Sequence, residues 1–191
     1  KTVLLREILV VLLKDCVVYI GDPKRADFVP LEDLDILRGR VFFEKEDIAQ
    51  MIADFKQTMN NRYDFMRAEM KKRGERDLGR FYEYGLKPNI LMVDEWNAFI
   101  ASLNRNARVS GQMMDDLLEI ILKGRQVGSY VILAMQKPTY DDLPTKLRDN
   151  MMHHISMGRL SESGYQMTFG DENVNKKFRY IERLNGKKVY G

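Results

Sequence analysis

NILMVDEW, residues 89–96, joins an apolar run to a pair of adjacent carboxylates. The residues from Ile90 to Val93 are all apolar, which predicts a buried strand. Asp94 and Glu95 follow where this strand ends. In open parallel sheets, the carboxyl ends of the strands form the edge at which ligands bind. The stretch therefore predicts a sheet and also the edge of that sheet where a site should be sought.

Other apolar segments alternate between extended and helical patterns along the chain. Strands are predicted at 16–21, 39–43, 129–136 and 153–158. Two further short strands are predicted on either side of Asn185-Gly186, a dipeptide typical of hairpin turns. Helices are predicted at 3–14, 46–72 and 113–125. This alternation indicates an α/β domain with a mostly parallel sheet flanked by helices and with a C-terminal β-hairpin.

Two features of these segments complete the predicted organisation. Apolar residues occupy nearly every side of the helix at 3–14, which predicts that this helix is largely buried. The charged, glycine-containing stretch 71–88 predicts an exposed loop. No repeat or convincing internal linker interrupts the pattern, so we expect one domain over residues 1–191.

The composition is that of an ordinary globular domain. The chain has 191 residues, of which 45% are hydrophobic and 31% are charged. Its net charge of +3 is small, so any contact with nucleic acid has to come from local patches. A single cysteine excludes an internal disulfide and fits a reducing compartment. Charged residues interrupt the longest apolar run, which excludes a membrane-spanning helix there.

The acidic pair and the first two residues suit the chemistry of a nucleoside-triphosphate hydrolase. Asp94 would hold Mg²⁺, through a water, and Glu95 would orient and deprotonate the attacking water. Lys1-Thr2 directly precedes an apolar helix, as do the last two residues of a Gly-Lys-Ser/Thr phosphate-binding loop. Lys1 would then reach the β- and γ-phosphates, and the Thr2 hydroxyl would bind Mg²⁺. Each feature also has a plain structural reading, as an acidic turn or as a chance Lys-Thr pair; their combination favours the hydrolase.

Two more polar residues lie where such a site would use them. Gln136 ends the strand in VILAMQKP, residues 131–138, where its amide could sense the γ-phosphate or position the water. Without the other elements it would be a polar strand cap. Arg125 lies near the end of the helix that precedes this strand. It could interact with the dipole of that helix, or project across a subunit boundary as an arginine finger.

The order of these motifs resembles that of a known family. GDPK at 21–24, VDEW at 93–96, GRQVG at 124–128 and LAMQKP at 133–138 occur in this order. The sequence is similar in this respect to the FtsK/SpoIIIE and HerA family of RecA-like DNA-translocating ATPases, from Lys1 to roughly Gly170. The segments GDPKRADF, VDEWNAF and GRLSESGY look most like those of FtsK-like coupling proteins of Gram-positive conjugative elements.

The resemblance implies a RecA-like P-loop NTPase core that begins within the Walker A motif. It makes Lys1 and Thr2 the end of Walker A, Asp94 and Glu95 the Walker B pair, and Gln136 the γ-phosphate sensor. It makes Arg125 a finger that acts on a neighbouring subunit, and it implies ATP and Mg²⁺ as cofactors.

The family's DPK segment and three departures from its pattern also bear on this chain. Asp22 and Lys24 are expected to pair with each other and hold their loop. The glycines that wrap the phosphates are missing from the sequence. So are an N-terminal membrane segment and a winged-helix module that reads DNA.

The best candidate for contact with DNA is LNRNARVSG, residues 103–111. It carries Arg105 and Arg108 without an acidic residue, and basic loops of this kind grip phosphates without reading bases. A solvated surface loop is an equally good interpretation. The stretch 71–80 is also basic but contains Glu75 and Asp77, so we expect a solvated connection or a subunit contact there. Zinc at the adjacent His153 and His154 is not expected, because no further ligand residues lie nearby in the sequence.

Taken with the residue observations, the resemblance implies an ATP-hydrolysing motor that moves double-stranded DNA, in conjugative transfer or in chromosome segregation. We expect a homo-oligomeric ring, a hexamer, in the cytoplasm at the inner face of the membrane. Its partners there would be transfer-machinery or membrane-anchored components. Two alternatives keep the fold: an FtsK-like protein-secretion ATPase, which neutral loops at 103–111 would favour, and a non-catalytic assembly domain. The presence of both Glu95 and Gln136 argues against the second.

Overall fold

A computed structural model of the chain describes residues 2–103, 107–158, 160–173, 181–182 and 188–189. It divides into two compact units, residues 2–135 and residues 136–191, which are considered separately below. The single domain expected from the sequence stays a prediction.

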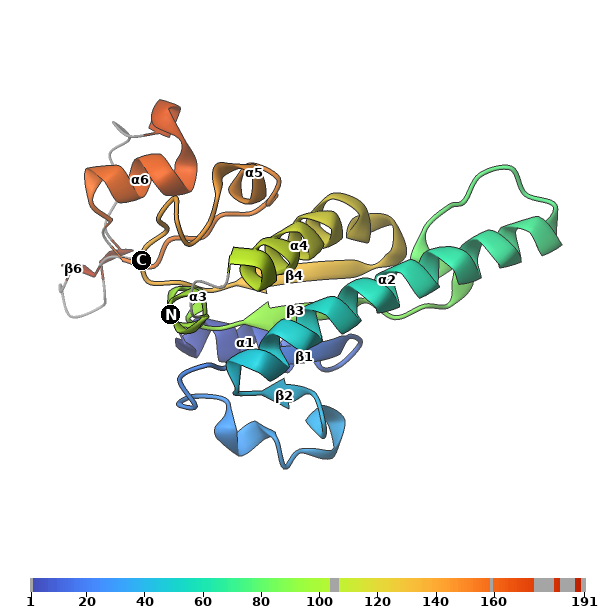
Figure 1. Cartoon of the computed structure of the whole chain (residues 1–191), viewed down its shortest axis with the longest axis horizontal. Coiled ribbons are helices and arrows are strands. Elements are labelled where there is room, and N and C mark those ends of the chain that lie inside the picture. Colours follow the sequence, from blue (N-terminus) through green and yellow to red (C-terminus); the bar gives the residue numbers. More distant parts are fainter. Residues whose placement is uncertain (1, 104–106, 159, 174–180, 183–187, 190–191) are drawn as a thin grey trace. The chain divides into compact units, whose positions relative to one another are not determined.

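The first unit is built on a four-stranded parallel sheet with the strand order β2-β1-β3-β4 (Figure 1). Its strands are β1 (Val17–Gly21), β2 (Val41–Phe42), β3 (Asn89–Val93) and β4 (Ser129–Leu133). Gly21 is paired with Val93, and Val93 with Leu133, so the three longer strands end at the same level. All four strands lie in segments where the sequence predicts them, although β4 ends at Leu133, before the predicted end at Gln136. The α/β fold with a parallel sheet is confirmed.

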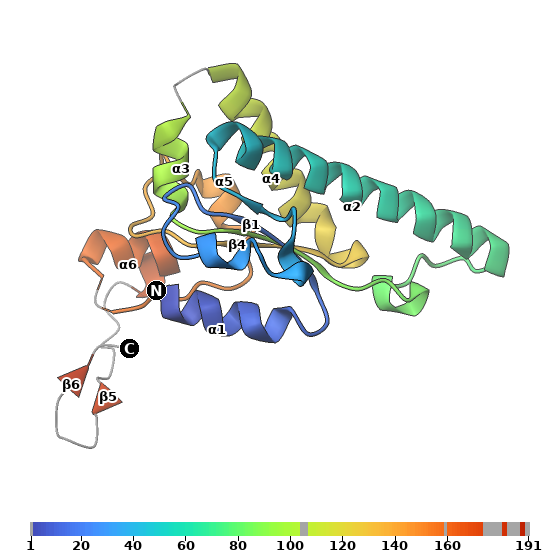
Figure 2. The same cartoon turned by 90° about the horizontal axis from the view of Figure 1, so that it is seen from below.

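Helices cover both faces of this sheet (Figure 2). One face is covered by α1 (Thr2–Leu12), whose buried Leu5 and Leu9 join the core cluster that contains Val18, Ile20, Ile90 and Met92. The other face is covered by α2 (Lys45–Arg73) and α4 (Ala107–Val127). There the ring of Tyr19 meets that of Phe55 edge-on, with 5.9 Å between the ring centroids. Successive residues of β1 therefore pack against α1 and α2 in turn, as the alternation of a strand requires.

Two expectations about helices need correction. The first helix is not largely buried, because the sheet covers one side of it: Val3, Val10 and Val11 are 73%, 60% and 64% exposed. The helix predicted at 113–125 begins earlier, at Ala107, so it takes up part of the predicted loop at 103–111. A further helix, α3 (Trp96–Ser102), starts directly after the acidic pair and was not predicted.

The stretch 71–88 is less irregular than predicted. Gly74 ends α2 in the left-handed conformation, with φ 69°, and its N–H bonds back to the last turn of the helix. The short 3₁₀ helix η3 (Phe81–Tyr84) follows before β3 begins. Two other 3₁₀ helices lie between β1 and β2, namely η1 (Val29–Leu31) and η2 (Asp35–Leu37).

The second unit contains α5 (Thr145–Arg148), α6 (Glu162–Phe169), η4 (Asp171–Asn173), β5 (Ile181–Glu182) and β6 (Lys188–Val189). The strand predicted at 153–158 is wrong. No described residue there is in a strand, and the ring Nε2 of His154 lies 3.2 Å from the carbonyl oxygen of Arg148. The strands β5 and β6 pair antiparallel, which confirms the predicted hairpin pairing, while Asn185-Gly186 between them lies outside the described residues.

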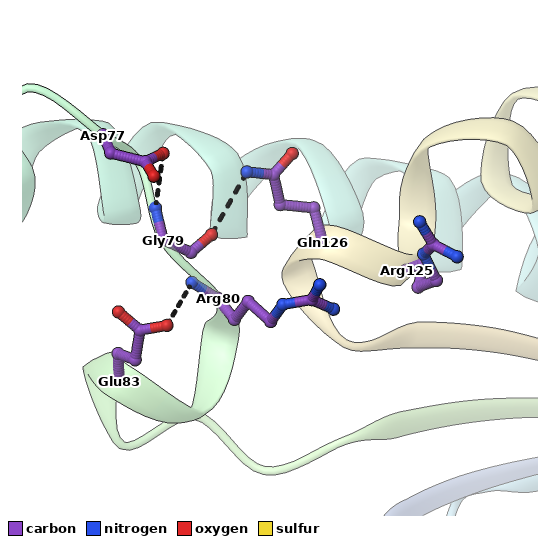
Figure 3. A pocket seen from close by; sticks show the side chains of 6 residues that line it. All are labelled: Asp77, Gly79, Arg80, Glu83, Arg125 and Gln126. Carbon is purple, nitrogen blue, oxygen red and sulfur yellow. Dashed lines mark hydrogen bonds between the residues drawn. The ribbon is translucent and has the colours of Figure 1, made fainter.

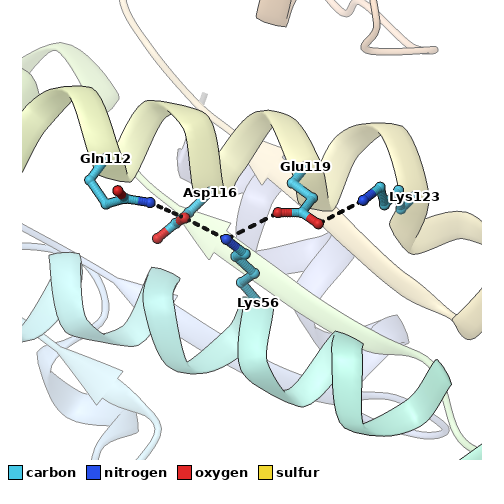
Figure 4. Close-up of polar contacts among 5 residues, drawn as sticks. All are labelled: Lys56, Gln112, Asp116, Glu119 and Lys123. Carbon is cyan, nitrogen blue, oxygen red and sulfur yellow. Dashed lines mark hydrogen bonds and ion pairs between the residues drawn. The ribbon is translucent and has the colours of Figure 1, made fainter. Parts of the chain in front are cut away.

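A network of charged side chains joins α2 to α4 (Figure 4). The Lys56 Nζ lies 2.8 Å from Asp116 Oδ1 and 3.0 Å from Glu119 Oε2. Gln112 donates to the same Asp116 oxygen, and Lys123 pairs with Glu119 at 2.8 Å. The hydrogen bonds that Lys56 donates to Asp116 and Glu119 raise the pKa of Lys56, while those that Glu119 accepts from Lys123 and Lys56 lower the pKa of Glu119. Each charge of this α2–α4 network thus has an opposite partner, which suits the buried position of Asp116.

A matched pair of glycine substitutions in α4 tests the packing of this helix. A Cβ at Gly124 would collide with the carbonyl oxygen of Ser129, whereas a Cβ at Gly111 would meet open space. We expect Gly124→Ala to lower the free energy of unfolding by about 1–3 kcal/mol, because backbone has to move. Gly111→Ala should raise it by about 0.5–1 kcal/mol through helix propensity. Urea unfolding measures both, and equal effects at the two positions would contradict the packing.

The α2–α4 network makes stability depend on pH. The folded pKa of Glu119 is lowered, so its ionised carboxylate stabilises the fold above its unfolded pKa, and this contribution is lost as the pH falls through the folded pKa. Glu119→Gln should therefore lower the free energy of unfolding by about 0.5–1 kcal/mol near pH ~7. In acid, well below the folded pKa, the variant and the parent should unfold alike.

Urea titrations of both proteins across the acid range measure this difference. Glu69→Gln is the control, because Glu69 has an ion pair with one exposed lysine, Lys72, on its own helix. A difference between Glu119→Gln and the parent that does not change with pH would rule out the carboxylate as its source.

Candidate functional site at the carboxyl edge of the sheet

Two buried carboxylates lie side by side where β1 and β3 end. Asp22 follows β1 and is 2% exposed, and Asp94 follows β3 and is 5% exposed. The N–H of Asp94 donates to the carbonyl oxygen of Gly21 at 2.9 Å, so the two chain segments stay paired beyond the strands. Charged side chains are rarely this buried without a specific role. The predicted edge of the sheet therefore carries an acidic site in the structure.

The amino end of α1 reaches the same edge. At its other end, the Leu12 carbonyl accepts from the N–H of Cys16, just before β1 starts. In the second turn of α1, the guanidinium of Arg6 donates to the carbonyl oxygen of Asp27, in the loop after β1. The helix thus runs antiparallel to β1, and Thr2 in its first turn lies at the carboxyl edge. Lys1 lies outside the described residues.

Asp94 and Glu95 are held by bonds from their neighbours in the chain. Asp94 Oδ1 accepts from the N–H of Glu95 at 2.8 Å. Glu95 has φ 49° and ψ 51°, the left-handed conformation, which costs a residue with a side chain about 1–3 kcal/mol. Its carbonyl accepts from the N–H of Ala98 at 2.8 Å, so α3 starts directly from this strained residue.

The helix α3 anchors the acidic pair to the core. The N–H of Trp96 donates to the carbonyl oxygen of Ala134 at 2.8 Å, and the side chains of Trp96 and Phe99 are fully buried. Trp96, Phe99 and Ile100 have the three- and four-residue spacing of a helix, so this element could have been found in the sequence.

Asp22 and Lys24 do not form the pair expected of them. Asp22 Oδ2 instead accepts from three backbone N–H groups, those of Ala26, Asp27 and Phe28, at 3.1, 3.2 and 3.1 Å. Lys24 Nζ lies 3.5 Å from Glu95 Oε2. The expected pairing is therefore wrong, because the Asp22 carboxylate serves the backbone of its own loop. The contact of Lys24 with Glu95 was missed, since nothing in the sequence aligns residue 24 with residue 95.

Two of the other predicted residues can be placed only along the chain. Gln136 follows the end of β4 and is the first residue of the second compact unit. Arg108 lies in the first turn of α4, and Arg105 lies outside the described residues. Their predicted roles stay predictions.

Arg125 lies at the opposite edge of the sheet from Glu95. It is in the last turn of α4, directly before β4 starts, whereas Glu95 follows the end of β3. Five strand residues separate the two edges, which is about 16 Å. Arg125 therefore does not reach Glu95 of its own chain, so the predicted role as an arginine finger would require a second chain and stays a prediction.

Around Arg125 lies a polar pocket of about 380 Å³ (Figure 3). The other lining residues are Asp77, Gly79, Arg80, Glu83 and Gln126. The two carboxylates bind backbone here: Asp77 accepts from the N–H of Gly79, and Glu83 accepts from that of Arg80. Gln126 donates to the carbonyl oxygen of Gly79, which ties the stretch 71–88 to α4.

The residues at the carboxyl edge fit Mg²⁺ bound to a nucleotide. The Asp94 carboxylate and the Thr2 hydroxyl are oxygen donors, which Mg²⁺ prefers, and the ion usually keeps several waters and binds phosphates as well. The amino end of α1 offers backbone N–H groups and a positive dipole to phosphates. In the part of the chain that the structure describes, no three His, Cys, Asp or Glu side chains form a metal cluster. Nor does any described helix have the length and apolar character needed to cross a membrane.

Sequence comparison gives one informative relative. No family model matches the chain. The chain is 33% identical over 175 residues to the FtsK domain-containing protein YdcQ of Bacillus subtilis (strain 168). The alignment covers 87% of the chain and 35% of YdcQ, so the chain corresponds to about a third of that relative.

Solved structures with the same fold include three ATPases or coupling proteins. The pCW3 conjugation coupling protein TcpA, solved in monomer form with ATPγS, matches with a TM-score of 0.72 and 16% identity over 91% of this chain and 49% of its own. The cytoplasmic domain of the type VII secretion ATPase EccC of Thermomonospora curvata matches with a TM-score of 0.62 and 14% identity, over 88% of this chain and 20% of its own. ATPases 2 and 3 of EssC from Geobacillus thermodenitrificans match with 0.55 and 12%, over 93% of this chain and 31% of their own. These matches confirm the resemblance to FtsK-like proteins, and the fold of this chain is that of a RecA-like ATPase domain.

Proposed function

We propose that this chain is the ATP-hydrolysing motor domain of an FtsK-like DNA translocase. One observation carries the proposal: the buried Asp94 and the adjacent Glu95 lie at the sheet edge that the amino end of α1 also reaches. A RecA-like ATPase fold needs a metal-binding carboxylate, a base and a helix amino terminus together at that edge. The similarity to an FtsK domain-containing protein supports the same function.

Each predicted site residue has a separate task in this proposal. Lys1 and the amino end of α1 bind the phosphates of ATP, and Thr2 and Asp94 hold Mg²⁺. Bound Mg²⁺ would neutralise the charge that develops on the phosphates during hydrolysis. Glu95 orients the attacking water and accepts its proton, and Gln136 senses the γ-phosphate.

We infer a homo-oligomeric ring from the position of Arg125. Since Arg125 and Glu95 lie at opposite edges of one sheet, Arg125 can complete a site only in a neighbouring chain. In a ring of six chains, each Arg125 would face the Glu95 of the next chain. The polar pocket around Arg125 would then belong to the contact between chains.

Conjugative DNA transfer is the setting that the comparisons favour. The conjugation coupling protein TcpA matches with a higher TM-score, 0.72, than the two secretion ATPases, at 0.62 and 0.55. The motor would work in the cytoplasm, at the inner face of the membrane, together with membrane-anchored transfer components. The secretion matches support the alternative, a motor of the same fold that moves protein.

Glu95→Gln tests the hydrolytic part of the proposal. The amide keeps the size of the side chain but cannot accept a proton, so we expect kcat for ATP to fall by about 10²–10⁴-fold while nucleotide binding persists. The measurement is steady-state ATP turnover, with and without double-stranded DNA, in a chain that carries a complete phosphate-binding loop before Lys1. Glu32→Gln, an exposed carboxylate of the same unit, is the control. A kcat for ATP that is changed neither by Glu95→Gln nor by the addition of double-stranded DNA would refute the proposed motor function.

Replacing Arg105 and Arg108 by Ala tests whether the cargo of the motor is DNA. If each contacts a DNA phosphate, the double Ala variant should bind duplex DNA more weakly. The slope of log K against log salt should also become shallower by about 2. Filter binding across a salt series measures both quantities. The double Ala variant of Lys71 and Arg76, both exposed, removes the same charge from the stretch 71–88 and should leave the slope unchanged. Equal losses in the two variants would show non-specific attraction, and no binding at all would favour a protein cargo.

A further inference from the structure

The loop after β1 brings a cation to the candidate base of the site. Lys24 Nζ lies 3.5 Å from Glu95 Oε2. The side chain of Glu95 is 12% exposed and that of Lys24 is 47% exposed. The carboxylate is thus largely withdrawn from solvent, while the ammonium approaches it from the outside. We propose that Lys24 is a positioning residue, which holds the Glu95 carboxylate in the orientation that hydrolysis requires; this rests on the function proposed above.

The backbone on the Lys24 side is rigid. Three N–H groups of residues 26–28 bind the buried Asp22 carboxylate, and the N–H of Asp22 donates to the carbonyl oxygen of Phe42 at 2.9 Å. Pro23 restricts the chain further, because its ring fixes φ. Arg25 has φ 50° and forms an ion pair with Glu44, so the residue next to Lys24 is also held in place. The ammonium of Lys24 therefore starts from a fixed Cα.

The backbone on the Glu95 side is equally constrained. Glu95 has φ 49° and is fixed on both sides by hydrogen bonds, from its own N–H to Asp94 and from the N–H of Trp96 to Ala134. Left-handed residues with side chains gather at functional sites, where the surrounding structure maintains them. The bond from Asp94 to Gly21 then connects the two loops directly. The remaining freedom lies in the Glu95 side chain, and the contact with Lys24 limits it.

A purely structural role would not account for this arrangement. A pair that includes a half-exposed lysine contributes little to stability. The fold nevertheless places one left-handed residue, Arg25, next to Lys24, and Glu95 itself is the other. Correct orientation of a base has a large effect on rate, since a misplacement of about 1 Å costs up to about 100-fold. The pair is therefore better explained by the orientation of Glu95 than by stability.

Kinetics of Lys24 variants test the role. In a chain with a complete phosphate-binding loop, we expect Lys24→Gln to lower kcat for ATP by about 10- to 100-fold with little change in KM. Lys24→Arg should recover most of the loss, because it keeps the charge at similar reach. In a Glu95→Gln background, Lys24→Gln should have no further effect. Arg38→Gln, which removes an exposed charge from the same connection between β1 and β2, is the control and should keep kcat within about twofold.

The single tryptophan supplies a measurement that does not depend on turnover. Trp96 is fully buried and follows Glu95 directly, so its fluorescence reports on the position of this segment. We expect Lys24→Gln and Glu95→Gln each to increase the quenching of Trp96 by acrylamide, and the double variant to match the single ones. Additive changes would show that the two side chains act independently and would overturn the proposal.

The outcomes separate this inference from the function on which it rests. A parent chain without Glu95-dependent turnover refutes the motor, and the role of Lys24 in hydrolysis falls with it. Glu95-dependent turnover with kcat unchanged or raised in Lys24→Gln refutes the inference alone. A raised KM with kcat unchanged also refutes it, and would assign Lys24 to the binding of phosphates instead.

Discussion

The hydrogen bond from the N–H of Asp94 to the carbonyl of Gly21 carries the pairing of β1 and β3 beyond the ends of the strands. Everything at the candidate site is arranged around it. In one chain segment, Gly21 is followed by Asp22 and the loop whose N–H groups bind this carboxylate. In the other, Asp94 is followed by Glu95 and α3. A shift of one residue in the pairing of β1 and β3 would move the side chains of the shifted strand to the opposite face of the sheet. Because α1 and α2 pack on opposite faces, such a shift would disrupt the core, and this packing therefore fixes the register. The core and the site thus share one constraint.

The sequence predicts the parts of the fold that depend on local periodicity. The four parallel strands, the long helix α2 and the pairing of the last two strands all follow from apolar spacing and turn residues. The position of Asp94 and Glu95 also follows, because residues at the carboxyl end of a buried parallel strand lie at one edge of the sheet. The failures have physical reasons as well. The run at 153–158 has the composition of a strand, but composition cannot supply a partner strand. The burial of α1 was overestimated because a helix that is apolar all round is covered only where another layer meets it.

The sequence predicts which residues lie at the candidate site, but it does not predict most of the contacts between them. The acidic pair and the amino end of α1 could be assigned to one edge from their order in the chain. The partners of Asp22 and Lys24 could not, because they depend on how the loop after β1 turns, and that turn is set by backbone bonds to a carboxylate. Arg125 shows the reverse case: its place before β4 already fixes it at the far edge of the sheet, which is a statement about topology alone.

The helix α2 is much longer than the sheet it covers. Its 29 residues span about 44 Å, against about 16 Å for the strands, and Figure 1 shows its last turns extending past them. Near its other end, Ile48 and Met51 press on Gly21, where a Cβ would come within 3.2 and 3.4 Å of their side chains. The end of α2 that packs on Gly21 therefore contacts the residue before Asp22. A displacement of the far end of the helix would change this packing, at the point where the loop after β1 begins.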